Sequence, residues 1–369
     1  MTTWSSAAAG GGLPGPSRRR KLRRSTVLPG CLVLLAAFVG FAIWVFQDRS
    51  HLNDTWTWDG LDWSQANSSE SPSWRWSAAY VYDESANHIV LFGGQADDAG
   101  NAKLLADTWS WDGHWTLRHP KLSPPAREGA AAASDPNREN VVLFGGEADA
   151  SGLQLLADTW TWDGRTWHLM ATKEAPPAET FDRSQLAAFD PKSGKVILVS
   201  QTDTKNQTIV DTWGWDGQIW TKLGSAEHLP APPGGAFQFP FHVFLYTDSQ
   251  QGRVVMLGAD VPLVWNGSKW SSQGLSGALL FGGGDFAYDA QTATVVSFGG
   301  STCNGLIGGG GHPSRDETWS WDGSAWRQLA PHTRPASRSI TYLAYDSRIR
   351  RVVMFGGYHA YSCMGNALF

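Results

Sequence analysis

Four arginines stand at comparable places along the chain, at Arg75, Arg127, Arg183 and Arg338. Three of them lie eight residues before an aspartate, and Arg183 lies seven residues before one. A guanidinium group can hold a carboxylate or phosphate through two parallel hydrogen bonds. If the four side chains converge, the sequence predicts a site for an anionic ligand. The structural alternative is that the arginines stack on aromatic neighbours or pair with carboxylates of the fold.

Two tryptophans flank the first of these arginines. Trp74 and Trp76 lie outside the recurring tryptophan phrases described below. Large aromatic rings present a broad apolar face and attract cations, so both residues are candidates for stacking against a ligand. Packing within the protein core is the alternative for both.

The cysteine spacing does not suggest a metal cluster. Cys303 and Cys363 each follow a Gly-Gly ending by a few residues, so they occupy equivalent loops. Outside the cytoplasm they can form a disulfide, and free thiols are the alternative. Two acidic loops offer oxygen ligands to Ca²⁺ or simply face solvent: Asp97 with Asp98, and Glu147 with Asp149.

A tryptophan phrase, DTW-x-WDG-x-x-W, recurs six times in complete or altered form. It alternates strictly with an apolar segment that ends in FGG in its fullest copies. An aspartate stands six residues before each apolar segment, where its carboxylate can accept backbone N–H bonds in a turn. The phrases begin at Asp54, Asp107, Asp158, Asp211, Val261 and Glu317, and the marker aspartates are Asp83, Asp135, Asp190, Asp248, Asp289 and Asp346.

Each repeat is expected to form four short strands. The first ends at the marker aspartate, the second ends in FGG, the third carries DTW-x-W and the fourth begins near the last tryptophan. The Asp-Gly of the phrase supplies the positive φ that a tight hairpin requires. A period near 50 residues with four strands is typical of β-propellers.

The FGG endings and spaced tryptophans resemble those of the kelch-repeat family, from about Asp54 to the C-terminus. This resemblance implies an all-β fold, a six-bladed β-propeller. The region begins with a tryptophan phrase and ends with an FGG segment. Six blades therefore require Asp54–Trp63 to share one blade with the segment before Asp346 and with Val352–Gly357, which closes the ring.

Galactose oxidase has similar repeats, and its family carries a copper site of two histidines and two tyrosines, one tyrosine linked to a cysteine. Residues of these types occur here at Tyr358, His359, Tyr361 and Cys363. They crowd one segment, whereas such a site draws its ligands from separate segments. Sialidases also use six blades and an arginine triad, but their turn motif differs from WDG-x-x-W. We therefore predict no catalytic, metal-binding or cofactor-binding residue.

The first 47 residues differ from the repeats. A basic run at 18–24 precedes an uncharged apolar stretch, and about 20 apolar residues in a helix span a bilayer. We expect residues 1–26 to form a cytoplasmic tail, residues 27–47 a transmembrane signal-anchor helix and residues 48–369 a propeller outside the cytoplasm. A cleaved signal peptide and lipidation at Leu28–Cys31 are the alternatives.

Charge and loop lengths limit the partners. Without the six basic residues of the tail, 23 basic residues face 34 acidic ones, which disfavours nucleic acid. The segments between the FGG ends and the tryptophan phrases vary in length and should lie on one face. We expect a single-pass membrane protein whose propeller binds or scaffolds a protein or glycan through that face. The alternative is an exterior hydrolase or lyase acting on glycans or peptides, with a copper radical oxidase as a weaker one.

Overall fold

The computed structural model describes the propeller region of the chain. The described residues are 49–98, 101–149, 154–178, 186–203, 208–227, 244–257, 262–272, 275, 285–300 and 314–360. All belong to one compact unit, Asp48–Phe369. The predicted tail and transmembrane helix lie outside these residues, as do Arg183, Cys303 and Cys363. Within the described part of the chain, no helix of sufficient length and apolar character to cross a bilayer is found.

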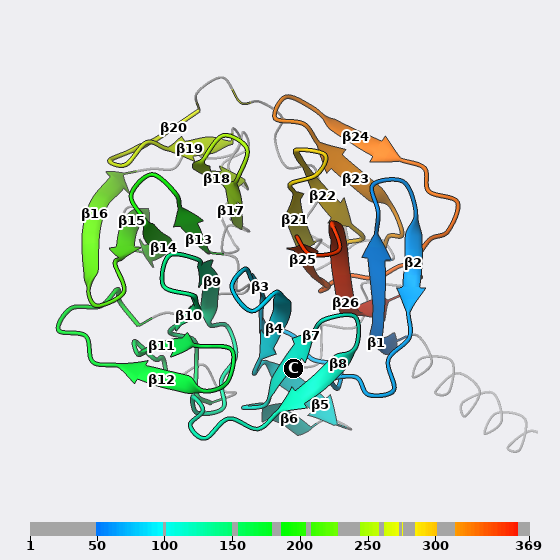
Figure 1. Ribbon diagram of the computed structural model, residues 1–369, viewed down its shortest axis with the longest axis horizontal. Helices are drawn as coiled ribbons and strands as arrows, with labels where there is room; N and C mark the ends of the chain where they lie inside the picture. The colour runs from blue at the N-terminus through cyan, green and yellow to red at the C-terminus, as the bar shows by residue number, and fades with distance from the viewer. Residues whose placement is uncertain are drawn as a thin grey trace, which may run out of the picture. The chain divides into compact units, whose positions relative to one another are not determined.

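Six four-stranded antiparallel sheets form the blades of a β-propeller, which confirms the predicted all-β, six-bladed fold (Figure 1). The first blade contains β3 (Ala79–Asp83), β4 (His88–Phe92), β7 (Thr108–Trp111) and β8 (Trp115–Arg118). The second contains β9 (Ala131–Asp135), β10 (Asn140–Phe144), β11 (Thr159–Trp162) and β12 (Trp167–Met170). The third contains β13 (Ala187–Asp190), β14 (Lys195–Asp203), β15 (Thr208–Trp215) and β16 (Trp220–Glu227).

The remaining blades follow the same order. The fourth contains β17 (Phe244–Asp248), β18 (Arg253–Leu257), β19 (Leu263–Trp265) and β20 (Trp270–Ser271). The fifth contains β21 (Asp285–Asp289), β22 (Thr294–Phe298), β23 (Thr318–Trp321) and β24 (Trp326–Leu329). The sixth contains β25 (Tyr342–Asp346) and β26 (Arg351–Ala360), followed by β1 (Arg49–Trp58) and β2 (Trp63–Ala66). A separate hairpin, β5 (Gln95–Asp98) with β6 (Asn101–Leu104), leaves the first blade between its second and third strands.

The first strands of the blades surround the centre of the ring (Figure 1). Each contacts the first strand of the next blade, and β25 contacts β3 in the same way. Their burial patterns are nearly continuous, because they pack against a neighbouring blade on each side. The core is therefore a series of apolar layers between blades.

Every first strand ends at its marker aspartate, as predicted. In the first blade, Asp83 accepts hydrogen bonds from the backbone N–H groups of Ser85 and Ala86 through Oδ1. The tryptophan phrase likewise turns at its Asp-Gly, where Gly60 has a φ of 98°. Local turn chemistry therefore sets the length of both hairpins in a blade.

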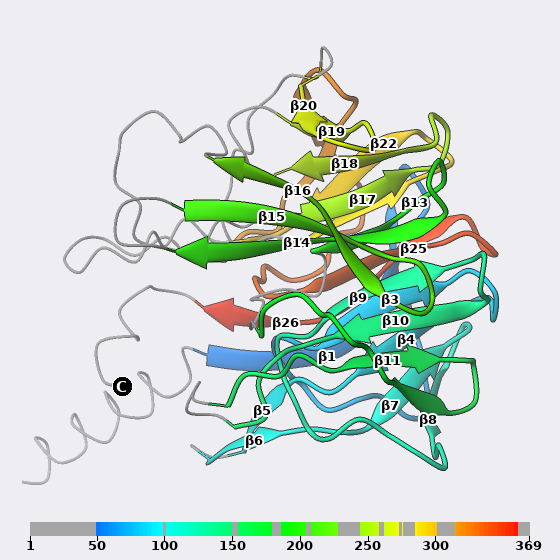
Figure 2. The ribbon, with the colours of Figure 1, turned by 90° about the vertical axis from the view of Figure 1, so that its left-hand side faces the viewer.

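The two faces of the propeller differ. We call the end that carries both hairpin turns of each blade the turn face, and the opposite end, where the second strand is connected to the third, the loop face. Figure 2 shows the loop face at the left, where β14, β15, β26 and β1 end or begin. The β5–β6 hairpin is one of its connections.

Tryptophans join neighbouring blades. In five blades the fourth-strand tryptophan donates a hydrogen bond from Nε1 to the threonine of the preceding blade's DTW phrase, at 2.8–3.0 Å. The pairs are Trp63–Thr318, Trp115–Thr55, Trp167–Thr108, Trp220–Thr159 and Trp270–Thr212. The seam between the fourth and fifth blades differs, because Pro262 replaces the threonine and Trp326 Nε1 has no partner among the described residues.

Candidate functional site

Arg75, Arg127 and Arg338 occupy one repeated structural position. Each is 1% exposed and lies within its own blade, just before the first strand. Arg75 binds both carboxylate oxygens of Asp107, at 2.7 and 3.0 Å, and donates to the carbonyl oxygen of Gly93. These three arginines make the carboxylate pairing that the sequence left open as the structural alternative.

A tryptophan completes each unit. Asp107 also accepts a hydrogen bond from Trp109 Nε1 at 2.7 Å, so the first and third residues of the DTW phrase meet at one carboxylate. The same arrangement recurs around Asp158 and Asp54 with these partners: Arg127 with Trp160, and Arg338 with Trp56. We call these three groups the Arg–Asp–Trp units.

The surroundings of each Arg–Asp–Trp unit favour the ionised form of its aspartate. Burial raises the pKa of Asp107, but the hydrogen bonds and charge of Arg75, with the bond from Trp109, outweigh it, and the pKa is lowered. The same balance lowers the pKa of Asp54 and Asp158. With each guanidinium buried and bound to a carboxylate, an anion would have to displace that carboxylate. Binding of a ligand by these arginines stays a prediction, as it does for Arg183.

Two other blades depart from the unit. In the third blade Asp211 pairs with Lys222, from the adjacent fourth strand, at 2.8 Å. In the fifth blade Glu317 replaces the aspartate, and it accepts hydrogen bonds from Arg315 and Trp319. In the third and fifth blades the position thus keeps an acid paired with a base, whereas the fourth repeat has Val261 there.

Trp74 and Trp76 belong to an aromatic cluster on the loop face. The Trp74 ring stacks on His51 with centroids 3.8 Å apart and meets Trp76 edge-on at 4.9 Å. Tyr358 lies against both His51 and Trp74, at 5.6 and 6.3 Å. We call these four residues the aromatic cluster, and they come from the first and sixth blades.

The aromatic cluster is only partly covered. Trp74 and Trp76 are half-buried and His51 is exposed. The indole Nε1 of Trp74 is buried and has no hydrogen-bond partner among the described residues. The sequence predicted the two tryptophans as candidates but missed His51 and did not join Tyr358 to them, because no spacing signal connects positions about 300 residues apart.

Residues considered for metal binding are not gathered in the described part of the chain. No group of three or more histidine, cysteine, aspartate or glutamate side chains able to hold a metal occurs there. Asp97 and the pair Glu147 and Asp149 lie on separate loop-face connections. Tyr358 and His359 are both on β26, where His359 Nδ1 lies 2.9 Å from the Ser337 hydroxyl. Tyr361 and Cys363 lie outside the described residues.

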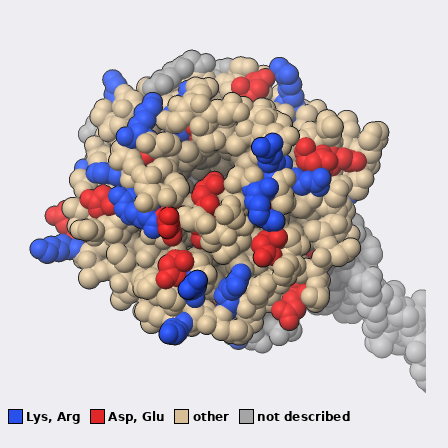
Figure 3. Space-filling model, in the orientation of Figure 1, with Lys and Arg blue, Asp and Glu red and all other residues tan. Residues whose placement is uncertain are grey.

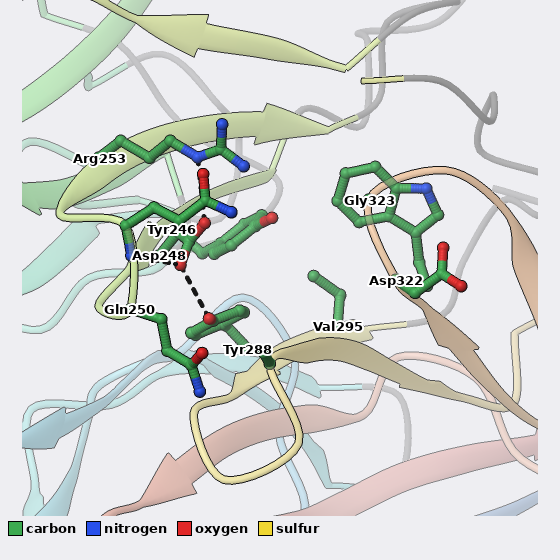
Figure 4. A pocket seen from close by; sticks show the side chains of 11 residues that line it. Tyr246, Asp248, Gln250, Arg253, Tyr288, Val295, Asp322 and Gly323 are labelled. Atoms are coloured by element: carbon green, nitrogen blue, oxygen red, sulfur yellow. Dashed lines mark hydrogen bonds and ion pairs between the residues drawn. The ribbon is translucent and has the colours of Figure 1, made fainter. Parts of the chain in front are cut away.

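A small polar pocket opens on the turn face, between the fourth and fifth blades (Figure 4). Its volume is about 50 Å³. Asp248 accepts hydrogen bonds from Arg253 Nε at 3.0 Å and from the Tyr288 hydroxyl at 2.8 Å. The lining residues are Tyr246, Asp248, Gln250, Gln251, Arg253, Tyr288, Ala293, Val295, Trp321, Asp322 and Gly323.

One sequence signal points to this pocket. The residue two before the marker aspartate is alanine or valine in five repeats, and it is Tyr246 in the fourth. It identifies the one seam where a large polar ring replaces a small side chain.

No protein-family model matches the chain, and a search among curated proteins finds no relative. Similar solved structures include a protein of unknown function from Bacteroides thetaiotaomicron, with 9% identity, a TM-score of 0.44, and coverage of 84% of this chain and 76% of the other. A putative TolB from Agrobacterium tumefaciens has 9% identity, a TM-score of 0.44 and coverage of 84% and 99%. Aleuria aurantia lectin has 12% identity, a TM-score of 0.37 and coverage of 73% and 84%.

Proposed function

We propose that this protein is a membrane-anchored binding or scaffolding module of the kelch-repeat type. In this proposal residues 27–47 hold it in the bilayer, the tail at 1–26 is cytoplasmic and the propeller lies outside the cytoplasm. Its partner is a protein or a glycan, and it binds on the loop face. In this proposal β1, which pairs with both β2 and β26, closes the ring and so holds the loop face together.

The observation that carries the proposal is the aromatic cluster. Its rings come from two blades, lie on the loop face and remain partly exposed. Aromatic residues, tryptophan and tyrosine above all, are enriched among those that dominate binding energy at interfaces.

The pairing of the arginines favours recognition over catalysis. A hydrolase of the kind considered above would need acids beside accessible channel arginines. The guanidinium groups of Arg75, Arg127 and Arg338 are instead buried against Asp107, Asp158 and Asp54. The aromatic cluster instead offers a partner an aromatic surface.

Replacement of Trp74 and Trp76 by alanine in the full chain tests this function. The full chain, purified in a mild detergent, would be applied to a glycan array and used for surface-proximity labelling, next to W74A/W76A. We expect binding to weaken by at least about tenfold, which is the loss of one hot-spot contact. Leu61→Ala is the control, because Leu61 is 83% exposed in a hairpin turn of the turn face.

Thermal unfolding of each variant would separate binding from stability. Saturable binding by the wild-type chain that W74A/W76A retains in full would contradict a role for the aromatic cluster. Failure of the wild-type chain to bind any glycan or capture any surface partner would contradict the proposed function.

A further inference from the structure

The turn-face pocket is a second site that the proposed function does not use. It lies at the seam between the fourth and fifth blades (Figure 4). The aromatic cluster is on the opposite, loop face. This is also the seam that lacks the tryptophan–threonine hydrogen bond. The Trp321 and Trp326 rings are 6.4 Å apart there, whereas the corresponding pairs of the other five blades lie at 5.3–5.5 Å. The pocket therefore lies beside the tryptophan pair whose spacing differs from that of the other five blades.

The hydroxyl group of Tyr246 has no hydrogen-bond partner among the described residues, although Tyr246 is only 7% exposed. Its ring is held in place by stacking on Tyr288, with centroids 5.0 Å apart. Burial, followed by the charge of Asp248, raises the pKa of Tyr246, so the hydroxyl is protonated and able to donate. Because Tyr246 lines the pocket and solvent reaches its hydroxyl there, the hydrogen-bond partner of this hydroxyl is the water or the ligand that occupies the pocket.

The charges of the pocket are already compensated. Asp248 is bound by Arg253 and Tyr288, and its Oδ1 also accepts the backbone N–H of Gln251. At the rim, Asp322 pairs with Arg327 at 3.0 Å and accepts backbone N–H groups of its own turn. Figure 3 shows basic and acidic side chains interspersed over this face. No net charge therefore selects an anion or a cation.

The remaining polar groups alternate in kind. Arg253 uses Nε for Asp248, and its terminal N–H groups have no partner among the described residues. The Gln251 amide can donate and accept, as can the Tyr246 hydroxyl. Hydroxyl groups of a ligand also do both.

We infer that the turn-face pocket binds a neutral polyhydroxylated ligand, the end group of a glycan or a free sugar, through the Tyr246 hydroxyl, Arg253 and Gln251. A volume of about 50 Å³ corresponds to roughly three to five water molecules, so the pocket takes one edge of a sugar ring and leaves the rest of the ligand outside. The ligand's hydroxyls replace the water that otherwise solvates the Tyr246 hydroxyl. This binding is independent of the loop face.

Binding of small probes to the full chain would be measured by saturation-transfer NMR and by calorimetric titration. The neutral probes are methyl glycosides of glucose, galactose, mannose and N-acetylglucosamine, together with sorbitol. Gluconate and glucosamine are the charged comparators. We expect saturable binding of at least one neutral probe, which Tyr246→Phe weakens by about fivefold or more, since one hydroxyl contact is lost. Gln251→Ala should weaken it as well.

Tyr345→Phe is the matched control, because Tyr345 is a half-buried turn-face tyrosine just before the marker Asp346 and does not line the pocket. Y246F removes a hydroxyl without a protein partner, so its melting temperature should equal or exceed that of the wild type. The inference would be overturned if no neutral probe bound saturably, which is the result expected of a pocket that holds only water. It would also be overturned if a charged comparator bound more tightly than the neutral probes, or if Y246F bound them as well as the wild type does. W74A/W76A should bind these probes normally, which separates this site from the proposed function.

Discussion

At the scale of single residues, the Arg–Asp–Trp units account for much of the repeated sequence. An arginine before the first strand and the first and third residues of the DTW phrase all meet at one carboxylate. A buried guanidinium without its partner is strongly unfavourable, so each acid is required by the arginine it binds. Arg75, Arg127 and Arg338 therefore stabilise the packing of the first, second and sixth blades.

Replacement of Asp158 by alanine should lower the free energy of unfolding by about 2–3 kcal/mol. This is less than for a fully buried pair, because the Asp158 side chain is 27% exposed and partly screened. The loss follows from leaving Arg127 buried and unpaired. Chemical denaturation at neutral pH would measure it, with Glu174→Ala, an exposed acid in the segment that follows the same blade, as a control near zero.

The pH dependence of this difference follows from the lowered pKa of Asp158. An aspartate whose folded pKa is depressed contributes stability above its unfolded pKa of about 3.9 and loses it as the pH falls through the folded value. The gap between wild type and D158A should therefore narrow below about pH 4. A gap that is constant from pH 7 to pH 3 would contradict the ion-pair explanation.

At the scale of the elements, the seams between blades are held by apolar layers and by one directional bond. The fourth-strand tryptophan of one blade reaches a threonine of the preceding blade in five of the six cases. The bonded threonines and most of these tryptophans are buried, so the bond is made away from water. It fixes the register between neighbouring blades.

Replacement of Thr108 by valine should destabilise the protein by about 1–3 kcal/mol, because the buried Trp167 Nε1 loses its acceptor while the side-chain shape is kept. Thr161→Val is the matched control: Thr161 is a buried third-strand threonine that bonds no tryptophan. Denaturant titration of the two variants would compare them. Equal destabilisation would show that the hydrogen bond contributes little to the seam.

At the scale of the whole propeller, one blade combines the two ends of the described chain. β1 pairs with β26 from Trp58 with Val352 to Arg49 with Ala360, with a register shift between Leu52 and Thr55. Arg338 binds Asp54, which is 284 residues away in the sequence. In the first and second blades the same unit is built from one continuous stretch of the chain. This sheet is the basis of the proposed ring closure.

Deletion of residues 49–66 should abolish cooperative unfolding, because the sixth blade loses two strands and β26 is left with an unpaired edge. Calorimetry of the full chain and of the deletion variant would show this as loss of the main transition. Deletion of residues 97–102 is the control, since the β5–β6 hairpin belongs to none of the six blades. An unchanged transition in the first variant would refute the closure.

The sequence by itself determined the features that depend on local chemistry. Turn aspartates, Asp-Gly hairpins and alternating phrases act over fewer than about 60 residues, so the strand order and the six blades could be predicted from their spacing. The candidate site could be predicted only in part: Trp74 and Trp76 were found, but His51 and the pocket around Tyr246 were not.

Only the tertiary structure decided what the candidate residues contact. Arg75 and its counterparts could have faced the channel or a carboxylate, and the direction of the side chain depends on residues 31 to 284 positions away. The aromatic cluster and the turn-face pocket likewise join residues from neighbouring blades. Spacing along a chain specifies hairpins, but such contacts exist only after the blades have packed against one another, because burial and side-chain direction are set there.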